Sequence, residues 1–161
     1  MAKYTVRSIR RDDRRWISQL LKKHWGSAEV VTRGKIHRAD HLPGFAAVDG
    51  KKSIGLITYR TEGADCEIVT LNSLVEGAGI GSELLGAVKT EADLSRCRRL
   101  WLITTNDNTP AIEFYKKRGF AMAAVYEDAI EESRKLKPEI PQIGVDGIPI
   151  TDEIEMEMML E

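Results

Sequence analysis

Residues 76–81, Glu76-Gly77-Ala78-Gly79-Ile80-Gly81, form a glycine-rich turn between two segments of different pattern. The run before it, Glu67-Ile68-Val69-Thr70-Leu71, is typical of a strand, and after it apolar residues recur at helical spacing as far as Val88. Glycines permit positive φ and close approach of the backbone, and the first N–H groups of a helix point toward an anion. The sequence therefore predicts a phosphate site, with a diphosphate-bearing cofactor as its ligand.

The spacing within this turn separates three kinds of glycine loop. A Walker loop needs Gly-Lys-Ser/Thr at its end, whereas Gly81 is followed by Ser82 and Glu83. A dinucleotide-binding loop needs its third glycine where Ser82 stands, and it normally follows the first strand of the chain. The spacing excludes the Walker loop and gives the dinucleotide loop little support.

The spacing Glu76-x-x-Gly79-x-Gly81 resembles motif A of the Gcn5-related N-acetyltransferases, Arg/Gln-x-x-Gly-x-Gly/Ala, which cradles the pyrophosphate of coenzyme A. Residues 106–120 resemble that family's motif B, Asn-x-x-Ala-x-x-Phe-Tyr-x-x-x-Gly-Phe, at every named position: Asn108, Ala111, Phe114, Tyr115, Gly119 and Phe120. The resemblance extends over about residues 3–127 and includes the C-terminal strand. The departure is Glu76, because a carboxylate beside pyrophosphate is unfavourable unless its side chain turns to solvent.

This resemblance implies an α+β fold with a mixed, mostly antiparallel central sheet flanked by helices. It also implies an N-acetyltransferase that transfers acetyl from acetyl-CoA to an amine of a small molecule or protein by direct attack. Two alternatives stay open: an O-acyl or longer-acyl transferase on the same fold, and a non-catalytic CoA-binding sensor. The cofactor-binding residues that it implies are the backbone groups of Leu71, Asn72 and Ser73 and the loop Glu76, Gly77, Ala78, Gly79, Ile80, Gly81 and Ser82.

Acetyl transfer to an amine needs a base for the amine and an acid for the departing thiolate. The resemblance places Tyr115 near the coenzyme sulfur, and a phenol with a pKa of about 10 is a candidate acid. Glu67 is the candidate base, with Asp65 as the alternative, acting directly or through water; both could instead be exposed surface acids. Asn108 either binds the pantetheine or caps a helix.

The segment 26–44 lies where enzymes of this kind build the acceptor pocket. Arg33 and His37 could there bind an anionic acceptor or take its proton, although ordinary loop residues would have the same composition. His37 and His41 are four residues apart, but no third ligand is apparent, so no metal is expected.

Composition agrees with one enzyme domain spanning residues 1–161. Lys and Arg number 24 against 25 Asp and Glu, so no net basic charge attracts nucleic acid or a membrane. The run Arg10–Arg15 is expected to be a solvated face. No apolar leader or spanning segment is seen, so we expect a cytoplasmic protein, monomeric or homodimeric. Cys66 and Cys97 are expected to be reduced and structural.

Alternating and helical patterns predict the elements along the chain. Strands are expected at 4–9, 45–48, 54–59, 66–71, 100–104, 120–126 and 154–160, with an Asp49-Gly50 hairpin turn. Helices are expected around 16–24, 78–93 and 109–117, the last capped by Thr109 with Pro110 in its first turn and Gly119 after its end. Residues 26–44 are expected to be a loop, with room for a short helix before the strand at 45–48. Residues 128–150 are expected to be an irregular loop rich in proline and glycine.

Overall fold

A seven-stranded sheet forms the centre of the computed structural model, which describes residues 4–160. The strands lie in the order β1-β4-β5-β6-β7-β9-β8, and neighbours are antiparallel except for β6 with β7. Their bounds are β1 Thr5–Ser8, β4 Gly44–Asp49, β5 Lys52–Glu62, β6 Asp65–Ser73, β7 Arg99–Thr105, β8 Ala121–Tyr126 and β9 Glu153–Met159. The α+β expectation is confirmed, with each expected strand present within a few residues.

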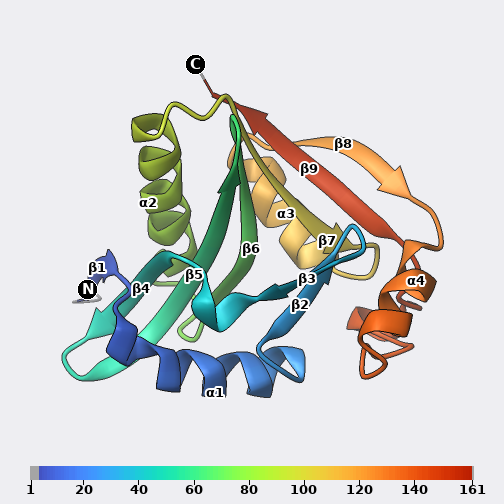
Figure 1. Ribbon diagram of the computed structural model, residues 1–161, viewed down its shortest axis with the longest axis horizontal. Coiled ribbons are helices and arrows are strands. Elements are labelled where there is room, and N and C mark those ends of the chain that lie inside the picture. Colours follow the sequence, from blue (N-terminus) through green and yellow to red (C-terminus); the bar gives the residue numbers. More distant parts are fainter. Residues whose placement is uncertain (1–3, 161) are drawn as a thin grey trace.

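Helices cover both faces of this sheet (Figure 1). On one face α2 (Ile80–Leu94) and α3 (Thr109–Lys117) enclose the larger core, and Leu84 and Val88 of α2 are fully buried there. On the other face α1 (Arg14–Trp25) packs Ile17 and Leu21 against Leu56 and Val69 of the sheet. The apolar spacing that predicted α1 and α2 therefore corresponds to their buried stripes.

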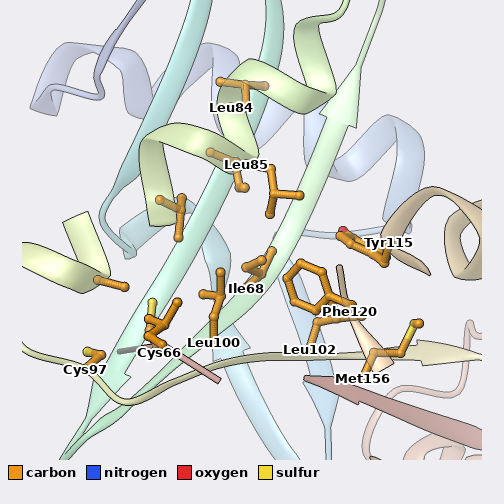
Figure 2. Packing of buried hydrophobic residues seen from close by; sticks show 14 of the residues in the cluster. Cys66, Ile68, Leu84, Leu85, Cys97, Leu100, Leu102, Tyr115, Phe120 and Met156 are labelled. Carbon is orange, nitrogen blue, oxygen red and sulfur yellow. The ribbon is translucent and has the colours of Figure 1, made fainter. Parts of the chain in front are cut away.

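The larger core is closed at the α3 end by aromatic side chains. Figure 2 shows Tyr115 beside Phe120, with Ile68 on the other side of Phe120 and with Leu102 and Met156 of the sheet below the two rings. Cys66 and Cys97 lie at the other end of this cluster as buried free thiols, and burial raises the pKa of Cys66 to about 12. A thiol that stays protonated and buried is a poor nucleophile, in agreement with a structural role.

The expectation of a loop at 26–44 was wrong for residues 29–38, whereas a short helical turn does lie before β4. The segment holds a two-stranded hairpin of β2 (Glu29–Thr32) and β3 (Lys35–Arg38), followed by a short 3₁₀ turn, Ala39–His41. Arg33 and Gly34 form its two-residue turn, both with positive φ, which is the backbone of a type I′ turn. Arginine rarely adopts this conformation, so the pair gave no hairpin signal in the sequence.

The expectation for residues 128–150 was also wrong in part, because the segment begins with α4 (Ala129–Leu136). The buried residues at and just after this helix are Ile130, Ser133 and Lys137, at helical spacing. Two of these three are polar, so the buried face carries no apolar stripe and the sequence pattern did not reveal a helix. A 3₁₀ turn, Val145–Gly147, follows within the remaining loop.

The charged run Arg10–Arg15 is not wholly a solvated face. Asp13 is buried, because its carboxylate accepts hydrogen bonds from Arg7, from the Trp16 indole and from the backbone N–H of Arg10. These donors, above all Arg7, hold its pKa well below the usual range. Among residues 4–160, no helix is both long and apolar enough to cross a bilayer.

Candidate functional site

The strands β6 and β7 pair only at their beginning. Their parallel register runs from Asp65–Arg99 to Ile68–Leu102, whereas β6 continues to Ser73 and β7 to Thr105. Figure 1 shows the two strands diverging from a shared end. Beyond the split β6 still pairs with β5, so within residues 4–160 its other edge carries backbone groups that no neighbouring strand takes up. Such an edge can bind an extended ligand through main-chain hydrogen bonds.

The predicted cofactor strand residues lie on this diverging part of β6. Leu71, Asn72 and Ser73 pair with Ile57, Leu56 and Gly55 of β5. The Asn72 side chain is already engaged, since its Oδ1 accepts a hydrogen bond from the Trp25 indole at 3.3 Å. Asn72 thus connects the open strand edge to the end of α1.

The glycine loop follows β6 and leads into α2, as the sequence predicted, with the helix starting at Ile80. Gly77 and Gly79 both have positive φ, and Gly79 is the residue that caps α2. A Cβ at Gly79 would meet nothing within 4 Å, so the backbone conformation, and not crowding, requires glycine there. The Tyr4 hydroxyl donates to the Ala78 carbonyl at 3.3 Å and holds the loop against β1.

Gly81 differs from the other two glycines, because its φ is not positive. A Cβ at this position would lie 3.1 Å from the Phe114 ring, so glycine here lets α2 approach α3. The expectation that all three glycines supply positive φ was therefore wrong for Gly81. Glu76 is exposed, which keeps its carboxylate in solvent.

Arg118 brings a positive charge to the first turn of α2. Its Nε donates to the Ser82 hydroxyl at 2.8 Å, and its guanidinium lies 3.7 Å from the centre of the Phe114 ring. The position of this guanidinium beside the glycine loop adds to the positive potential at the start of α2.

Tyr115 is a core residue with 6% of its surface exposed. Its ring makes edge contacts with Phe114 and Phe120 at centroid separations of 5.2 and 5.3 Å, and Figure 2 shows the hydroxyl directed away from α3. Burial raises the pKa of this phenol well above its usual value. The hydroxyl therefore keeps its proton at neutral pH and is suited to donating a hydrogen bond.

Asn108 caps α3, where the sequence had suggested Thr109. Its Oδ1 accepts from the backbone N–H of Ala111 at 3.3 Å, and Pro110 lies in the first turn of the helix. Thr109 is instead the first residue of α3, so that assignment was wrong by one position. Asn108 was considered for pantetheine binding and for helix capping, and the structure shows the helix cap.

Three of the polar side chains near the split form a buried chain of hydrogen bonds. The Thr32 hydroxyl donates to Glu67 Oε2 at 2.8 Å and lies 2.7 Å from His37 Nε2. Desolvation lowers the pKa of His37, so the ring is neutral at pH 7. Because an ionised carboxylate can only accept, the hydroxyl proton goes to Glu67 and His37 Nε2–H donates to the Thr32 oxygen. One lone pair of that oxygen remains.

Glu67 is 1% exposed, so the alternative of an exposed surface acid was wrong for this residue. Arg60 Nε donates to its Oε1 at 2.7 Å and supplies the compensating charge. Asp65 is 47% exposed at its side chain and lies 3.9 Å from Arg99. The two candidate bases thus differ: Glu67 belongs to a buried network and Asp65 to the surface.

Two cavities meet at Thr32. The larger, about 330 Å³, lies beside the β6–β7 split and is lined by Val69, Ile103, Asn108, Glu153 and residues of α1, β2, α4 and the C-terminal loop. The smaller, about 240 Å³, is lined by Glu67, Arg60 and Asp65 among others. Thr32 lines both, whereas Glu67 lines only the smaller one. Thr32 therefore lies between the larger cavity and the buried carboxylate to which its hydroxyl donates.

Arg33 does not line the larger cavity. Its Nη1 and backbone N–H donate to Glu153 at 2.9 and 3.2 Å, and its guanidinium lies 3.4 Å from the centre of the Tyr126 ring. Glu153 is 2% exposed, so Arg33 neutralises a buried carboxylate. The structure thus brings His37 together with Glu67 and places Arg33 in a separate ion pair.

The sequence reading missed Thr32, Glu153 and Trp25 as site residues. Thr32 precedes the unrecognised hairpin turn, and Glu153 lies one residue before the terminal strand predicted at 154–160. An alternation in β2 of exposed Glu29 with buried Val30 would have been a usable signal for a strand there. No local pattern indicates that distant residues such as Thr32 and Glu67 meet.

Comparison with known proteins identifies the family to which the chain belongs. The model of the acetyltransferase (GNAT) family matches residues 5–120. The chain belongs to the GNAT family. The resemblance carried by the glycine loop and by residues 106–120 is thereby confirmed.

This GNAT protein is also similar to a curated protein in sequence and to solved structures in fold. The Bacillus subtilis protein YdhI, described only as uncharacterized, is 49% identical over 139 residues, covering 86% of this chain and 87% of its own. An IAA acetyltransferase from Bacillus cereus has a similar fold, with a TM-score of 0.72 at 19% identity over 98% of this chain and 100% of the other. A GNAT acetyltransferase from Elizabethkingia anophelis, solved with acetyl-CoA bound, matches with a TM-score of 0.71 at 18% identity over 99% and 100%.

Proposed function

We propose that this GNAT protein transfers the acetyl group of acetyl-CoA to an amine by direct attack in a ternary complex. The observation that carries the proposal is the split between β6 and β7, which opens beside the glycine loop and the larger cavity. A donor along β6 would thus present its thioester to an acceptor in that cavity. Release of CoA thiol from acetyl-CoA, measured with and without a panel of amines, tests this function.

The donor would be held mainly by backbone groups. The pyrophosphate would lie at the start of α2 against Gly77 to Ser82, and the pantetheine along Leu71, Asn72 and Ser73. Arg118 supports this placement, because its hydrogen bond to Ser82 holds a positive charge at the first turn of α2. Asn108 lines the larger cavity while it caps α3, so its remaining amide hydrogens are available to the pantetheine.

Glu67 would act as the base through Thr32. The amine nitrogen forms its bond to the thioester carbon as its proton passes to the Thr32 oxygen and the hydroxyl proton passes to Glu67. His37 fixes the hydroxyl for this transfer by donating to the same oxygen. Glu67 then loses its proton to the smaller cavity, which it lines. Arg33 would act indirectly, by neutralising Glu153 in the wall of the larger cavity.

The carbon–sulfur bond breaks in the same reaction and leaves the CoA thiolate. The Tyr115 hydroxyl is proposed to act on this sulfur. Because burial raises the pKa of Tyr115, hydrogen-bond donation that stabilises the thiolate is favoured over complete proton transfer, and a proton from solvent completes the thiol. The products are an N-acetylated amine and free CoA.

The alternatives differ in what they require of the buried network. A CoA-binding sensor needs the split and the loop but has no use for a buried carboxylate linked to the acceptor cavity through Thr32. Retained CoA binding without thiol release on any amine would favour the sensor. Thiol release with alcohols, or with longer acyl-CoA donors in preference to acetyl-CoA, would favour the acyltransferase alternatives.

Gly79→Val is expected to weaken CoA binding about tenfold to a hundredfold, because a β-branched residue is strained at this positive φ and the loop would rearrange. Titration calorimetry with CoA measures the change. Gly63→Val is the matched control, since Gly63 also has positive φ and open space but lies in the β5–β6 turn. Equal affinities for CoA in the two variants would contradict the placement of the pyrophosphate.

Glu76→Gln is expected to tighten CoA binding by about two- to fivefold at low salt. The substitution removes an exposed negative charge near the proposed pyrophosphate, and exposed charges interact weakly. The difference from the parent should shrink as ionic strength rises. Weaker binding by Glu76→Gln would mean that the carboxylate stabilises the loop.

Thr32→Val is expected to lower turnover about a hundredfold or more, because it breaks the path from the acceptor cavity to Glu67. Thr32→Ser keeps the hydroxyl and should retain most of the activity. Both variants are compared at saturating acetyl-CoA, with thermal unfolding as a check on stability. Turnover of the valine variant within about twofold of the serine variant would rule out the relay.

A further inference from the structure

The larger cavity has predominantly apolar walls. They come from the end of α1, the hairpin strand β2, both sides of the β6–β7 split and residues 130–153. The apolar residues that define it are Trp25, Val69, Ile103, Ile130, Ile140 and Ile150. A ligand body that fills this space loses its contact with water, so the walls favour hydrocarbon over polar groups.

The buried charges in these walls already have partners. Lys137 Nζ donates to the carbonyl oxygens of Trp25 and Glu29 at 2.6 and 2.7 Å, and Glu153 accepts both contacts from Arg33. His24 and Glu139, the other ionisable lining residues, are exposed at the rim. A second ammonium group on an acceptor would therefore enter beside the buried Lys137 cation, and the buried Glu153 carboxylate is already paired with Arg33, so its entry is costly.

The larger cavity is also small, and α4 and the loop that follows it bound it on one side. The Lys137 contacts tie the end of α4 to the turn after α1, and Arg134 donates to the carbonyl oxygens of Pro141 and Ile150. The volume of about 330 Å³ lies near the lower end of the roughly 300–1,000 Å³ typical of ligand pockets. This space suits a small molecule and not a folded peptide segment.

We propose that the acceptor is a small primary amine with an uncharged hydrocarbon body, alkyl or arylalkyl. The inference rests on the proposed acetyl transfer and specifies its substrate class. The amine end lies toward Thr32, where its proton is removed, and the hydrocarbon body contacts the apolar walls. Polyamines and aminoglycosides are disfavoured because each carries further positive charge.

The decisive comparison is between hexylamine and cadaverine, which differ in that a methyl group is replaced by a second ammonium. Thiol release from acetyl-CoA is measured for both, and kcat/KM is expected to be at least about a hundredfold higher for hexylamine. Across butylamine, pentylamine and hexylamine, kcat/KM should rise about fourfold per methylene. An equal or higher kcat/KM for cadaverine would overturn the proposal.

A wall variant tests whether this cavity is the site of selection. Ile103→Thr replaces apolar surface by a hydroxyl on a half-buried residue and should lower kcat/KM for hexylamine by at least about fivefold. Ile36→Thr is the matched control, since Ile36 is 46% exposed on β3 and lines neither cavity. Equal losses in the two variants would place the amine elsewhere.

Calorimetry of both amines in the presence of CoA separates this inference from the proposed function. Tighter binding of hexylamine without any thiol release would support the substrate class and refute acetyl transfer. Turnover that favours charged amines would refute the substrate class and leave acetyl transfer standing. Neither binding nor turnover of the alkylamines, with turnover of another amine class, would likewise overturn the hydrocarbon acceptor.

Discussion

Glu67→Gln is expected to reduce turnover by about 10²- to 10⁴-fold while acetyl-CoA affinity stays within about twofold of the parent. The amide keeps the size of the side chain and can still accept the Thr32 hydroxyl, but it cannot take up the proton of the acceptor. The loss should appear in kcat at saturating amine, measured by thiol release. Raising the pH should restore part of the activity, because a larger fraction of the amine is then already neutral.

The control for this substitution is Glu62→Gln. Glu62 shares Arg60 with Glu67, accepting from Arg60 Nη1 at 2.6 Å, but it is exposed and does not contact Thr32. Glu62→Gln should leave turnover close to that of the parent. If both variants lose activity equally, the effect comes from displacing Arg60, and Glu67 is not the base.

Tyr115→Phe is expected to lower turnover about a hundredfold with little change in acetyl-CoA affinity. The hydroxyl acts on a sulfur that gains charge only as the thioester breaks, and removal of one such donor typically costs about 10²- to 10³-fold. The ring, and with it the edge contacts to Phe114 and Phe120, is retained. Pre-steady-state acetyl transfer and thermal unfolding, measured together, separate chemistry from packing.

Tyr59→Phe provides the same chemical change on β5. The Tyr59 ring stacks on Phe45 at a centroid separation of 6.2 Å, and its hydroxyl has no proposed role. Turnover of Tyr115→Phe that matches Tyr59→Phe, or a loss of stability large enough to account for the defect, would return Tyr115 to the role of a core aromatic residue. Water would then have to serve the thiolate.

The sequence predicted the elements whose patterns are local. The strand, the glycine loop and α2 are adjacent in the chain, and their periodicity and turn chemistry are visible in one short stretch. The β2–β3 hairpin and α4 were not predicted, because each departs from the sequence pattern that is usual for its type of element. The hairpin has Arg33 at a turn position with positive φ, and the buried face of α4 and the residue after it includes Ser133 and Lys137. Tertiary contacts, which are not visible in local sequence, stabilise both.

The candidate site was predicted less completely, because its residues meet across the fold. Glu67 was identified as a candidate base, yet its hydrogen-bond partner Thr32 is 35 positions away in the chain. Arg33 was considered as an anion ligand, and the partner that changes this interpretation, Glu153, is 120 positions away. Charge and residue type indicated candidates, whereas their pairing required the three-dimensional structure.

The most direct test of the account is to incubate the protein with acetyl-CoA and an amine panel and to measure CoA thiol and acetylated product together. The panel contains hexylamine, phenethylamine, cadaverine, an aminoglycoside and a short peptide with a free N-terminus. The account predicts one equivalent of N-acetylated amine for each thiol released, and no such product with Glu67→Gln in the same time. Tight CoA binding with no acetylated amine from any member of the panel would contradict it.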